Sequence, residues 1–263
     1  MEPHILFFDI DGTLLEEETG NMTERTKQAL QEARGNGHYT FLNTGRSFAE
    51  LDPRLTELDF DGEVCGCGTH IKYLGRDLKK KTIDGEEAQK IVEILEKAKV
   101  QGLLEGEEYF YISKHTTNPK LLAVKNGFGE EVNQKCRYWE EEKPSFQKLT
   151  IWLDKKSDLD MVKNYLQEKY DFIKRAEDFY EIIPVGHSKA TGMEEVMRYL
   201  DIKREHTMAI GDSTNDLAML EYANLSVAMG NSQDAVKEKV SFVTKSVTEE
   251  GVAHALSHFG FIK

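Results

Sequence analysis

The two ends of the chain alternate between short apolar runs and amphipathic segments. Residues 4–8 predict a buried strand, because they form an apolar run of strand length. Thr23 predicts the N-cap of a helix over residues 24–33, which Gly35 would end. A second apolar strand is expected over residues 39–42. A strand, a helix and a strand at this spacing indicate a βαβ unit with a parallel sheet.

The same order of elements returns near the other terminus. It predicts, in turn, a helix over 191–200, a strand over 207–210, a loop over 211–215, a helix over 216–222 and a strand over 225–228. The two distant segments are therefore expected to form parts of one α/β layer. In such a layer the functional loops lie at the carboxyl ends of the strands.

The middle of the chain has a different pattern. Short β-like runs over 109–112, 149–153 and 180–183 are mixed with amphipathic helices, without strict alternation. The clearest helix is expected over 85–99, where one face carries Ala88, Ile91, Val92, Leu95 and Ala98. This pattern predicts an α+β domain over residues 81–185, inserted into a discontinuous core of residues 1–80 and 186–263.

Composition and charge exclude several classes of protein. The formal net charge of −13 over 263 residues provides no basic surface for nucleic acid or an anionic membrane. The apolar run at residues 5–8 is too short for a signal peptide or a membrane span, so a cytoplasmic location is the default. Cys65, Cys67 and Cys136 match no zinc spacing and are expected to be reduced and structural. The oligomeric state stays open.

The sequence Asp9-Ile10-Asp11-Gly12-Thr13 directly follows the first predicted strand. Residues two apart on an extended chain point to the same side, so both carboxylates can face one reacting centre. Gly12 permits a close approach of the backbone to a ligand, and Thr13 adds a donor. Taken alone, the motif is also compatible with an acidic turn.

Three further features stand in order along the chain: Thr44-Gly45-Arg46, Lys189, and the run from Gly211 to Asp216. Thr44 offers a hydroxyl to a phosphoryl oxygen, and a helix expected to begin near Ser47 would add an N-terminal anion site. Arg46 is given no role. An isolated acidic loop such as 212–216 would favour helix capping, but its place relative to the first motif favours a catalytic site.

These residue types together supply the parts needed for phosphoryl transfer from a monoester. A carboxylate such as Asp9 is a competent nucleophile, because it forms a labile acyl phosphate. Asp11 can protonate the departing alcohol and then accept a proton from water. The carboxylates of Asp212 and Asp216 are expected to bind a hard cation such as Mg²⁺ or to orient the residues that bind it. Lys189 can neutralise the phosphate and the charge of Asp9.

The motifs resemble those of the haloacid dehalogenase superfamily of phosphohydrolases, and more narrowly its Cof-type members. The resemblance spans nearly the whole chain and implies a Rossmann-like core with an α+β cap domain. It implies Asp9 as nucleophile, Asp11 as acid and base, and Mg²⁺ bound by Asp9, the Asp11 carbonyl and Asp212, with Asp216 near the metal. The residues expected beside the phosphate are Gly12, Thr44, Gly45, Lys189 and Asn215.

Two departures from the family pattern stand out. Lys189 is followed by Ala190-Thr191-Gly192 where many relatives have a lysine-glycine pair, and Gly66-Cys67-Gly68-Thr69 replaces a serine-asparagine-glycine loop. The expected activity is Mg²⁺-dependent hydrolysis of a small phosphorylated metabolite, such as a sugar phosphate. A hexose phosphate mutase and a non-catalytic protein that binds phosphorylated metabolites stay open as alternatives.

Overall fold

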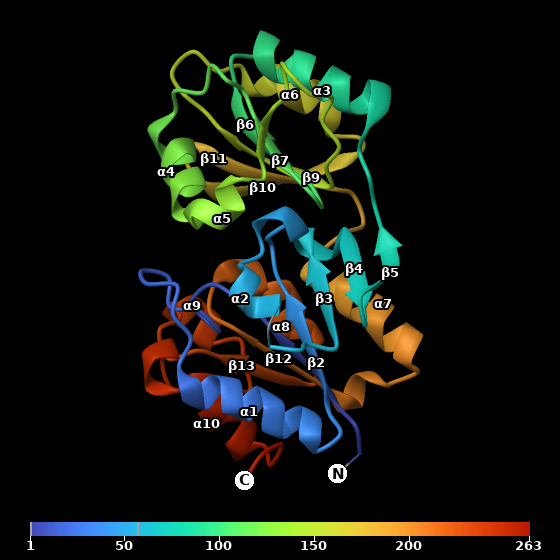
Figure 1. Ribbon diagram of the computed structural model, residues 1–263, viewed down its shortest axis with the longest axis vertical. Coiled ribbons are helices and arrows are strands. Elements are labelled where there is room, and N and C mark those ends of the chain that lie inside the picture. Colours follow the sequence, from blue (N-terminus) through green and yellow to red (C-terminus); the bar gives the residue numbers. More distant parts are fainter. Residues whose placement is uncertain (1, 57) are drawn as a thin grey trace. The chain divides into compact units, whose positions relative to one another are not determined.

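The computed structural model describes residues 2–56 and 58–263 (Figure 1). The chain forms two compact units. The first unit comprises Met1–Gly45, Arg54–Lys79 and Ser188–Lys263, and the second comprises Arg46–Pro53 and Lys80–His187. The sequence places the inserted domain at residues 81–185 and the core at residues 1–80 and 186–263. These domain bounds stay a prediction.

Within the described residues, the centre of the first unit is an eight-stranded sheet. Its strand order is β14-β13-β12-β1-β2-β3-β4-β5. The strands are β1 Ile5–Phe8, β2 Tyr39–Asn43, β3 Gly62–Cys65, β4 His70–Tyr73, β5 Arg76–Lys80, β12 Thr207–Gly211, β13 Leu225–Ala228 and β14 Phe242–Val243. Strand β1 pairs in parallel with β12 on one side and with β2 on the other. The carboxyl ends of these three strands therefore meet at one edge.

Helices cover both faces of this sheet. Ile5 and Phe7 on one face of β1 belong to a core cluster with Met193 of α7 and Met219 of α8. Alternate residues of a strand face opposite sides, and the other side carries α1 and α10, which lie next to each other (Figure 1). The helices are α1 Glu24–Gly35, α2 Pro53–Thr56, α7 Lys189–Leu200, α8 Leu217–Tyr222, α9 Asp234–Lys237 and α10 Gly251–His258. The expected α/β fold with a parallel sheet between helical layers is confirmed.

The chain's local signals decide where two of these segments begin. Thr23 is the N-cap of α1, and its side chain accepts a hydrogen bond from the Thr26 amide, as the sequence predicts. The helix expected near Ser47 is instead a single 3₁₀ turn over Phe48–Glu50. Glu50 Oε2 accepts hydrogen bonds from the Ser47 amide at 2.8 Å and the Ser47 hydroxyl at 2.9 Å. The helix N-terminus expected at this position is therefore replaced by a single turn.

The second unit is built on another sheet, in the order β10-β11-β9-β6-β7-β8. Its neighbouring strands are antiparallel except for β7 and β8. The strands are β6 Gln101–Glu105, β7 Phe110–Ile112, β8 Cys136–Tyr138, β9 Lys148–Trp152, β10 Tyr170–Ala176 and β11 Phe179–Pro184, and the helices are α3 Gly85–Lys97, α4 Pro119–Gly127, α5 Gly129–Asn133 and α6 Leu159–Leu166. An α+β character is confirmed for this segment.

Apolar side chains fill the core of the second unit on both sides of its sheet. The predicted face of α3 is buried through Ala88, Ile91, Val92 and Leu95, and it packs in one cluster with α6. Aromatic side chains from the β-like runs are also buried, namely Phe110, Tyr111, Trp139 and Trp152. These aromatic residues stabilise the unit by removing large apolar surfaces from water.

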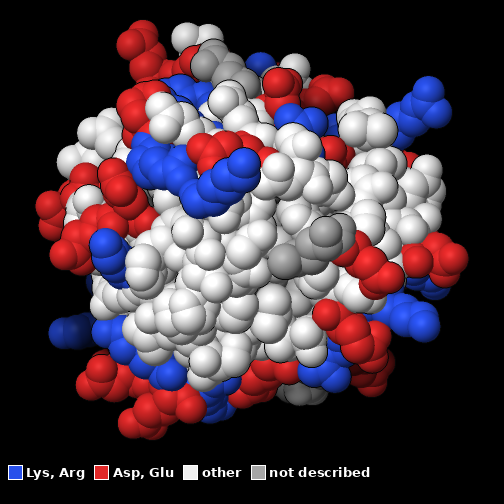
Figure 2. All heavy atoms as spheres, turned by 90° about the horizontal axis from the view of Figure 1, so that it is seen from below, with Lys and Arg blue, Asp and Glu red and all other residues white. Residues whose placement is uncertain are grey.

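The surface of the first unit around the two chain termini is seen from below in Figure 2. Residues other than Lys, Arg, Asp and Glu occupy the middle of this face, and charges of both signs lie around its rim. Across residues 2–56 and 58–263, no helix combines the length and the apolar character required to span a bilayer.

Candidate active site

Asp9 follows β1 at the edge where the central strands end. Its amide donates to Ile210 O at 3.0 Å, which continues the pairing of β1 with β12 by one residue. The side chain is only 4% exposed. The first motif and the loop after β12 are therefore neighbours, although they are far apart in the sequence.

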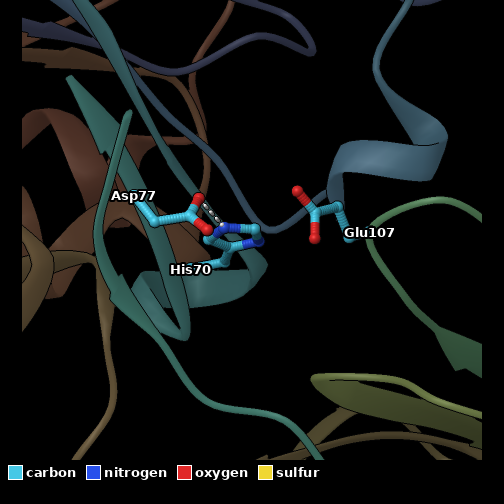
Figure 3. A group of neighbouring side chains, drawn as sticks. All are labelled: His70, Asp77 and Glu107. Atoms are coloured by element: carbon cyan, nitrogen blue, oxygen red, sulfur yellow. Dashed lines mark hydrogen bonds and ion pairs between the residues drawn. The ribbon is translucent and has the colours of Figure 1, made fainter. Parts of the chain in front are cut away.

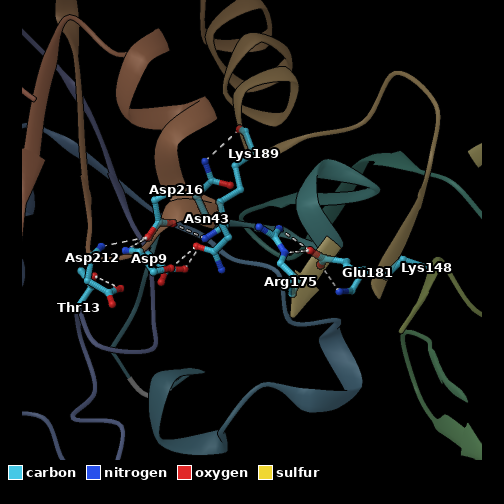
Figure 4. Close-up of polar contacts among 11 residues, drawn as sticks. Asp9, Thr13, Asn43, Lys148, Arg175, Glu181, Lys189, Asp212 and Asp216 are labelled. Carbon is cyan, nitrogen blue, oxygen red and sulfur yellow. Dashed lines mark hydrogen bonds and ion pairs between the residues drawn. The ribbon is translucent and has the colours of Figure 1, made fainter. Parts of the chain in front are cut away.

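Lys189 is the first residue of α7, directly after the N-cap Ser188. Its side chain is buried and its Nζ atom donates to Oδ1 of Asp9 and to Oδ1 of Asp216, in both cases at 2.6 Å (Figure 4). A reciprocal capping box between Ser188 and Thr191 fixes the start of the helix. The lysine that the sequence singled out only by position thus pairs with two carboxylates of the sequence motifs.

Asp216 holds the loop after β12 in shape. Its Oδ2 atom accepts hydrogen bonds from the amides of Asp212 and Ser213, both at 3.0 Å, while Oδ1 accepts from Lys189. A Cβ atom at Gly211 would lie 2.6 Å from the Asp216 side chain, so only glycine fits there. Both carboxylate oxygens of Asp216 therefore already have protein partners.

Asp212 and Asp9 present carboxylates to the same region. Oδ1 of Asp212 accepts a hydrogen bond from Thr13 Oγ1 at 3.3 Å. The carboxylates of Asp9, Asp212 and Asp216 each offer an oxygen, and these oxygens lie within 4.8 Å of one another. Carboxylate oxygens are the donors that Mg²⁺ prefers, so this group fits a hard divalent cation. The sequence prediction that a metal binds here stays a prediction.

Gly12 provides the close approach between the first motif and Asp212. It has a φ of +75°, and a Cβ atom added there would lie 2.5 Å from Asp212 Oδ2. A side chain at this position would therefore occupy the space beside the carboxylate. The glycine expected from the motif is required by geometry as well as by backbone conformation.

Burial and mutual repulsion shape the electrostatics of the group. Burial, reinforced by the charge of Asp216, raises the pKa of Asp9 well above its ordinary value, although Lys189 acts in the opposite direction. Burial and the same carboxylate raise the pKa of Asp212 to about 7. Burial would lower the pKa of Lys189, but Asp216 and Asp9 outweigh it and raise that pKa. Positive charge beside Asp9 and Asp212 would therefore stabilise their ionised forms.

Thr44 follows β2 and is tied to the loop after β3. Its amide donates to Val64 O at 2.9 Å, and its carbonyl accepts from the Cys67 amide at 3.0 Å. Gly68 in that loop is so close to α7 that a Cβ atom would lie 2.4 Å from Ser188 O. The unusual Gly66-Cys67-Gly68 sequence therefore positions Thr44 and the start of α7.

The remaining predicted residues lie on the same loops. Asp11 is half-buried, and its charge contributes to raising the pKa of Asp9. Asn215 lies in the turn after β12, where its Oδ1 accepts from Ser213 Oγ at 2.7 Å. Gly45 ends the first segment of the first unit, and Arg46 belongs to the second unit. The sequence predictions that name Asp11, Thr44, Gly45 and Asn215, together with Asp9, Gly12, Lys189, Asp212 and Asp216, as site residues stay predictions.

Two asparagines that the sequence analysis did not single out contact this group. Asn43 Nδ2 donates to the carbonyl oxygen of Lys189 at 3.1 Å. Asn231 Nδ2 donates to the carbonyl oxygen of Gly12 at 2.8 Å. Asn43 ends β2 and Asn231 follows β13, so both stand where the strand-end rule expects functional loops.

A second polar pair lies elsewhere in the first unit. His70 Nε2 is 2.7 Å from Asp77 Oδ1 (Figure 3). His70 begins β4 and Asp77 belongs to β5, which neighbours it in the sheet. Glu107, drawn in the same figure, belongs to the second unit. The pair connects two strands at the edge of the sheet.

The fold and this group of side chains agree with the comparison to known families. The model of the haloacid dehalogenase-like hydrolases matches residues 6–256. The chain belongs to this family. It is a hydrolase of the phosphatase type, within the Cof-type group that the motifs resemble.

Individual relatives cover the chain almost completely. It is 26% identical to the 5-amino-6-(5-phospho-D-ribitylamino)uracil phosphatase YitU of Bacillus subtilis (strain 168), over 98% of both chains. It is 28% identical to the phosphatase YcsE of the same organism, whose name gives the same substrate, over 97% of this chain and 95% of the other. The solved structure of the HAD subclass IIB sugar phosphatase BT4131 matches with a TM-score of 0.80 and 28% identity, over 98% of this chain and all of the other.

Proposed function

We propose that this protein hydrolyses a small phosphorylated metabolite through a phosphoryl group carried on Asp9, in a reaction that depends on Mg²⁺. The observation that supports this most strongly is the position of Lys189 Nζ, 2.6 Å from Asp9 Oδ1 in a buried site. A buried ammonium beside a carboxylate favours the ionised form of that carboxylate and offers positive charge to a phosphoryl oxygen.

The reaction proceeds in two displacements. An oxygen of Asp9 forms a bond to phosphorus as the bond between phosphorus and the ester oxygen breaks, and Asp11 gives its proton to the departing alkoxide. Asp11 then accepts a proton from the water that attacks the phosphorus of the aspartyl phosphate. This second step breaks the bond between phosphorus and Asp9 and releases inorganic phosphate. Asp9 returns to a carboxylate and Asp11 to its protonated form.

The residues that would hold Mg²⁺ are Asp9, Asp212 and the carbonyl group of Asp11. Bound there, the ion supplies positive charge that offsets the repulsion between the carboxylates and the phosphate dianion. Thr13 orients Asp212 through its hydroxyl, which donates to Oδ1. Asp216 orients Lys189 through its Oδ1 atom and the backbone of the loop after β12 through its Oδ2 atom.

The substrate we infer is a phosphate ester of a sugar or polyol. The names of three relatives support this class, since two describe a phosphoribitylamino compound as the substrate and one describes a sugar phosphatase. Gly12, Thr44, Gly45, Lys189 and Asn215 would contact the phosphate. The inserted domain over residues 81–185 would select the remainder of the molecule.

The test is phosphate release from a panel of sugar and polyol phosphates, with and without Mg²⁺, by the wild-type protein and by Asp9→Asn. We expect Mg²⁺-dependent turnover that Asp9→Asn lacks. The exposed Asp201→Asn serves as a matched control and is expected to behave as wild type. Turnover by Asp9→Asn at the wild-type rate would contradict the mechanism. If the protein isomerises phosphate esters without releasing phosphate, it is a mutase. If it binds them without turnover, it is a sensor.

A further inference from the structure

The side chain of Asn231 connects three separate segments of the first unit. Its Nδ2 donates to Gly12 O at 2.8 Å, and its Oδ1 accepts from the Val247 amide at 3.0 Å. One contact therefore reaches the loop over residues 9–13, called here the catalytic loop. The other reaches the 3₁₀ turn over Val247–Glu249. Both polar groups of this amide have a partner with good hydrogen-bond geometry.

The backbone around Asn231 is held on both sides. The Met229 amide donates to Gly211 O at 3.0 Å, which ties this loop to the end of β12. The Gly230 amide donates to Lys245 O at 2.9 Å, and a Cβ atom at Gly230 would lie 2.6 Å from the Ser246 amide nitrogen. Asn231 is thus presented to the catalytic loop from a fixed backbone, which is the requirement for an accurate positioning contact.

The contact acts on a peptide plane next to the metal-binding group. The Gly12 amide donates to Leu15 O at 2.8 Å, and this bond fixes the plane that contains the Asp11 carbonyl. Asn231 fixes the next plane, which contains the Gly12 carbonyl and the Thr13 amide. Thr13 in turn donates to Asp212 through its hydroxyl. The Thr13 amide also donates to Ile10 O at 3.3 Å, so loss of the Asn231 contact would leave the plane of the Gly12 carbonyl held by one long hydrogen bond.

We infer that Asn231 is a positioning residue that holds the Asp11–Thr13 segment in the geometry required for Mg²⁺ binding and phosphoryl transfer. The inference rests on the proposed function for its catalytic part. Asn231 contacts neither the substrate nor the reacting atoms in this role. It acts through the Gly12 carbonyl.

The surroundings of Asn231 separate this role from a purely structural one. A cavity of about 390 Å³ is lined by Gly12, Asn231, Val247 and polar neighbours that include Asp212 and Thr248. In Asn231→Ala, water from this cavity can hydrate the freed Gly12 carbonyl and Val247 amide at little cost in stability. A mobile water does not fix the orientation of the peptide plane. Activity and Mg²⁺ affinity should therefore fall much more than stability.

The experiment compares Asn231→Ala and Asn231→Asp with the wild-type protein. Asn231→Asp keeps an acceptor for the Val247 amide but places a carboxylate oxygen against Gly12 O. Asn36→Ala is the matched control, because Asn36 Nδ2 also donates to a backbone carbonyl, Phe261 O, at 2.8 Å. Three quantities are measured: kcat and KM with p-nitrophenyl phosphate, the Kd for Mg²⁺ by calorimetry without substrate, and the Tm.

We expect both Asn231 variants to lose roughly tenfold or more in kcat, about 1.4 kcal/mol in the barrier, with KM changed by less than about threefold. The Kd for Mg²⁺ is expected to rise about fivefold or more, and the Tm to stay close to that of Asn36→Ala. The inference is overturned if kcat and the Mg²⁺ Kd stay within about twofold of wild type, or if Asn36→Ala shows equal losses. An inactive wild-type protein would instead contradict the proposed function, while the Mg²⁺ titration would still decide the role of Asn231.

Discussion

Lys189 Nζ lies 2.6 Å from Asp9 Oδ1, and both side chains are almost completely buried. Removal of the ammonium in Lys189→Met leaves the carboxylates of Asp9 and Asp216 without their shared counter-charge. We expect kcat/KM to fall by roughly a hundredfold or more, because buried positive charge is worth several kcal/mol to a developing anionic transition state.

The control for this change is Lys239→Met, which removes an exposed lysine paired with Glu221 in the same unit. Its effect is expected to be small, since exposed ion pairs contribute little. Steady-state kinetics with a phosphate ester provide the measurement for both variants. Wild-type kcat/KM in Lys189→Met would rule out an electrostatic role for this lysine.

Asp11→Ala tests the proton transfer in the first displacement. We expect a large loss of kcat on an alkyl phosphate, whose alkoxide leaving group needs a proton, and a smaller loss on p-nitrophenyl phosphate. The ratio of kcat for the two substrates, wild type against variant, provides the measurement. Equal losses on both substrates would contradict Asp11 as the acid.

Gly12→Ala and Gly37→Ala separate backbone strain from the contact with Asp212. Both glycines have positive φ, +75° and +89°, but a Cβ atom at Gly37 would have open space around it. Each substitution should cost roughly 1 kcal/mol in the free energy of unfolding through the left-handed backbone alone. Only Gly12→Ala is expected to weaken Mg²⁺ binding and to lose most activity, as judged by calorimetry and kinetics. Similar effects of the two variants would show that the approach to Asp212 has no functional weight.

The pH dependence of stability in the second unit should report on Glu181. Burial opposes its ionisation, but Lys148 and Arg175 outweigh this and lower its pKa to about 2. Lys148 Nζ and Arg175 Nη2 each lie 2.5 Å from one of its oxygens (Figure 4). A lowered pKa means that the ionised form stabilises the folded state. This contribution is complete above the unfolded pKa near 4.5 and is lost as the pH falls toward 2.

Urea unfolding of wild type and Glu181→Gln between pH 2 and pH 6 measures this contribution. We expect wild type to be more stable by about 3 kcal/mol near pH 6 and the difference to shrink below pH 4.5. Glu105, which also contacts Lys148, has a raised pKa because burial and the charge of Glu50 outweigh the lysine. The charge of Glu181 also contributes to raising the pKa of Glu105, so the difference between the two proteins reports on the coupled group of Glu181, Glu105 and Lys148. A difference that stays constant with pH would contradict the assignment.

The sequence predicted those parts of the site that depend on local order. Asp9 and Asp212 each follow an apolar run that forms a strand of the parallel sheet, so the edge at which they meet could be predicted. The burial of Lys189 could not, because it depends on packing against residues 180 positions away. Asn231 was missed for the same reason, since its partner Gly12 is 219 positions away.

Local structure explains two errors in the predicted elements. The helix expected over 191–200 begins at Lys189, because Ser188 and Thr191 form a capping box that starts it earlier. The helix expected near Ser47 ends after one turn, because Leu51 has extended backbone and Pro53 follows shortly after it. The strands β4 and β5 were missed because residues such as Lys72, Arg76 and Asp77 break the apolar pattern on which the strand prediction depends.

The pairing of β1 with β12 also has a consequence for how the protein folds. The strand that precedes Asp9 pairs on one side with a strand close to the other end of the chain, and contacts of such high sequence separation form slowly. The whole second unit lies between them in the sequence. Recovery of catalysis after dilution from denaturant should therefore be among the last events of refolding, later than the return of helical circular dichroism.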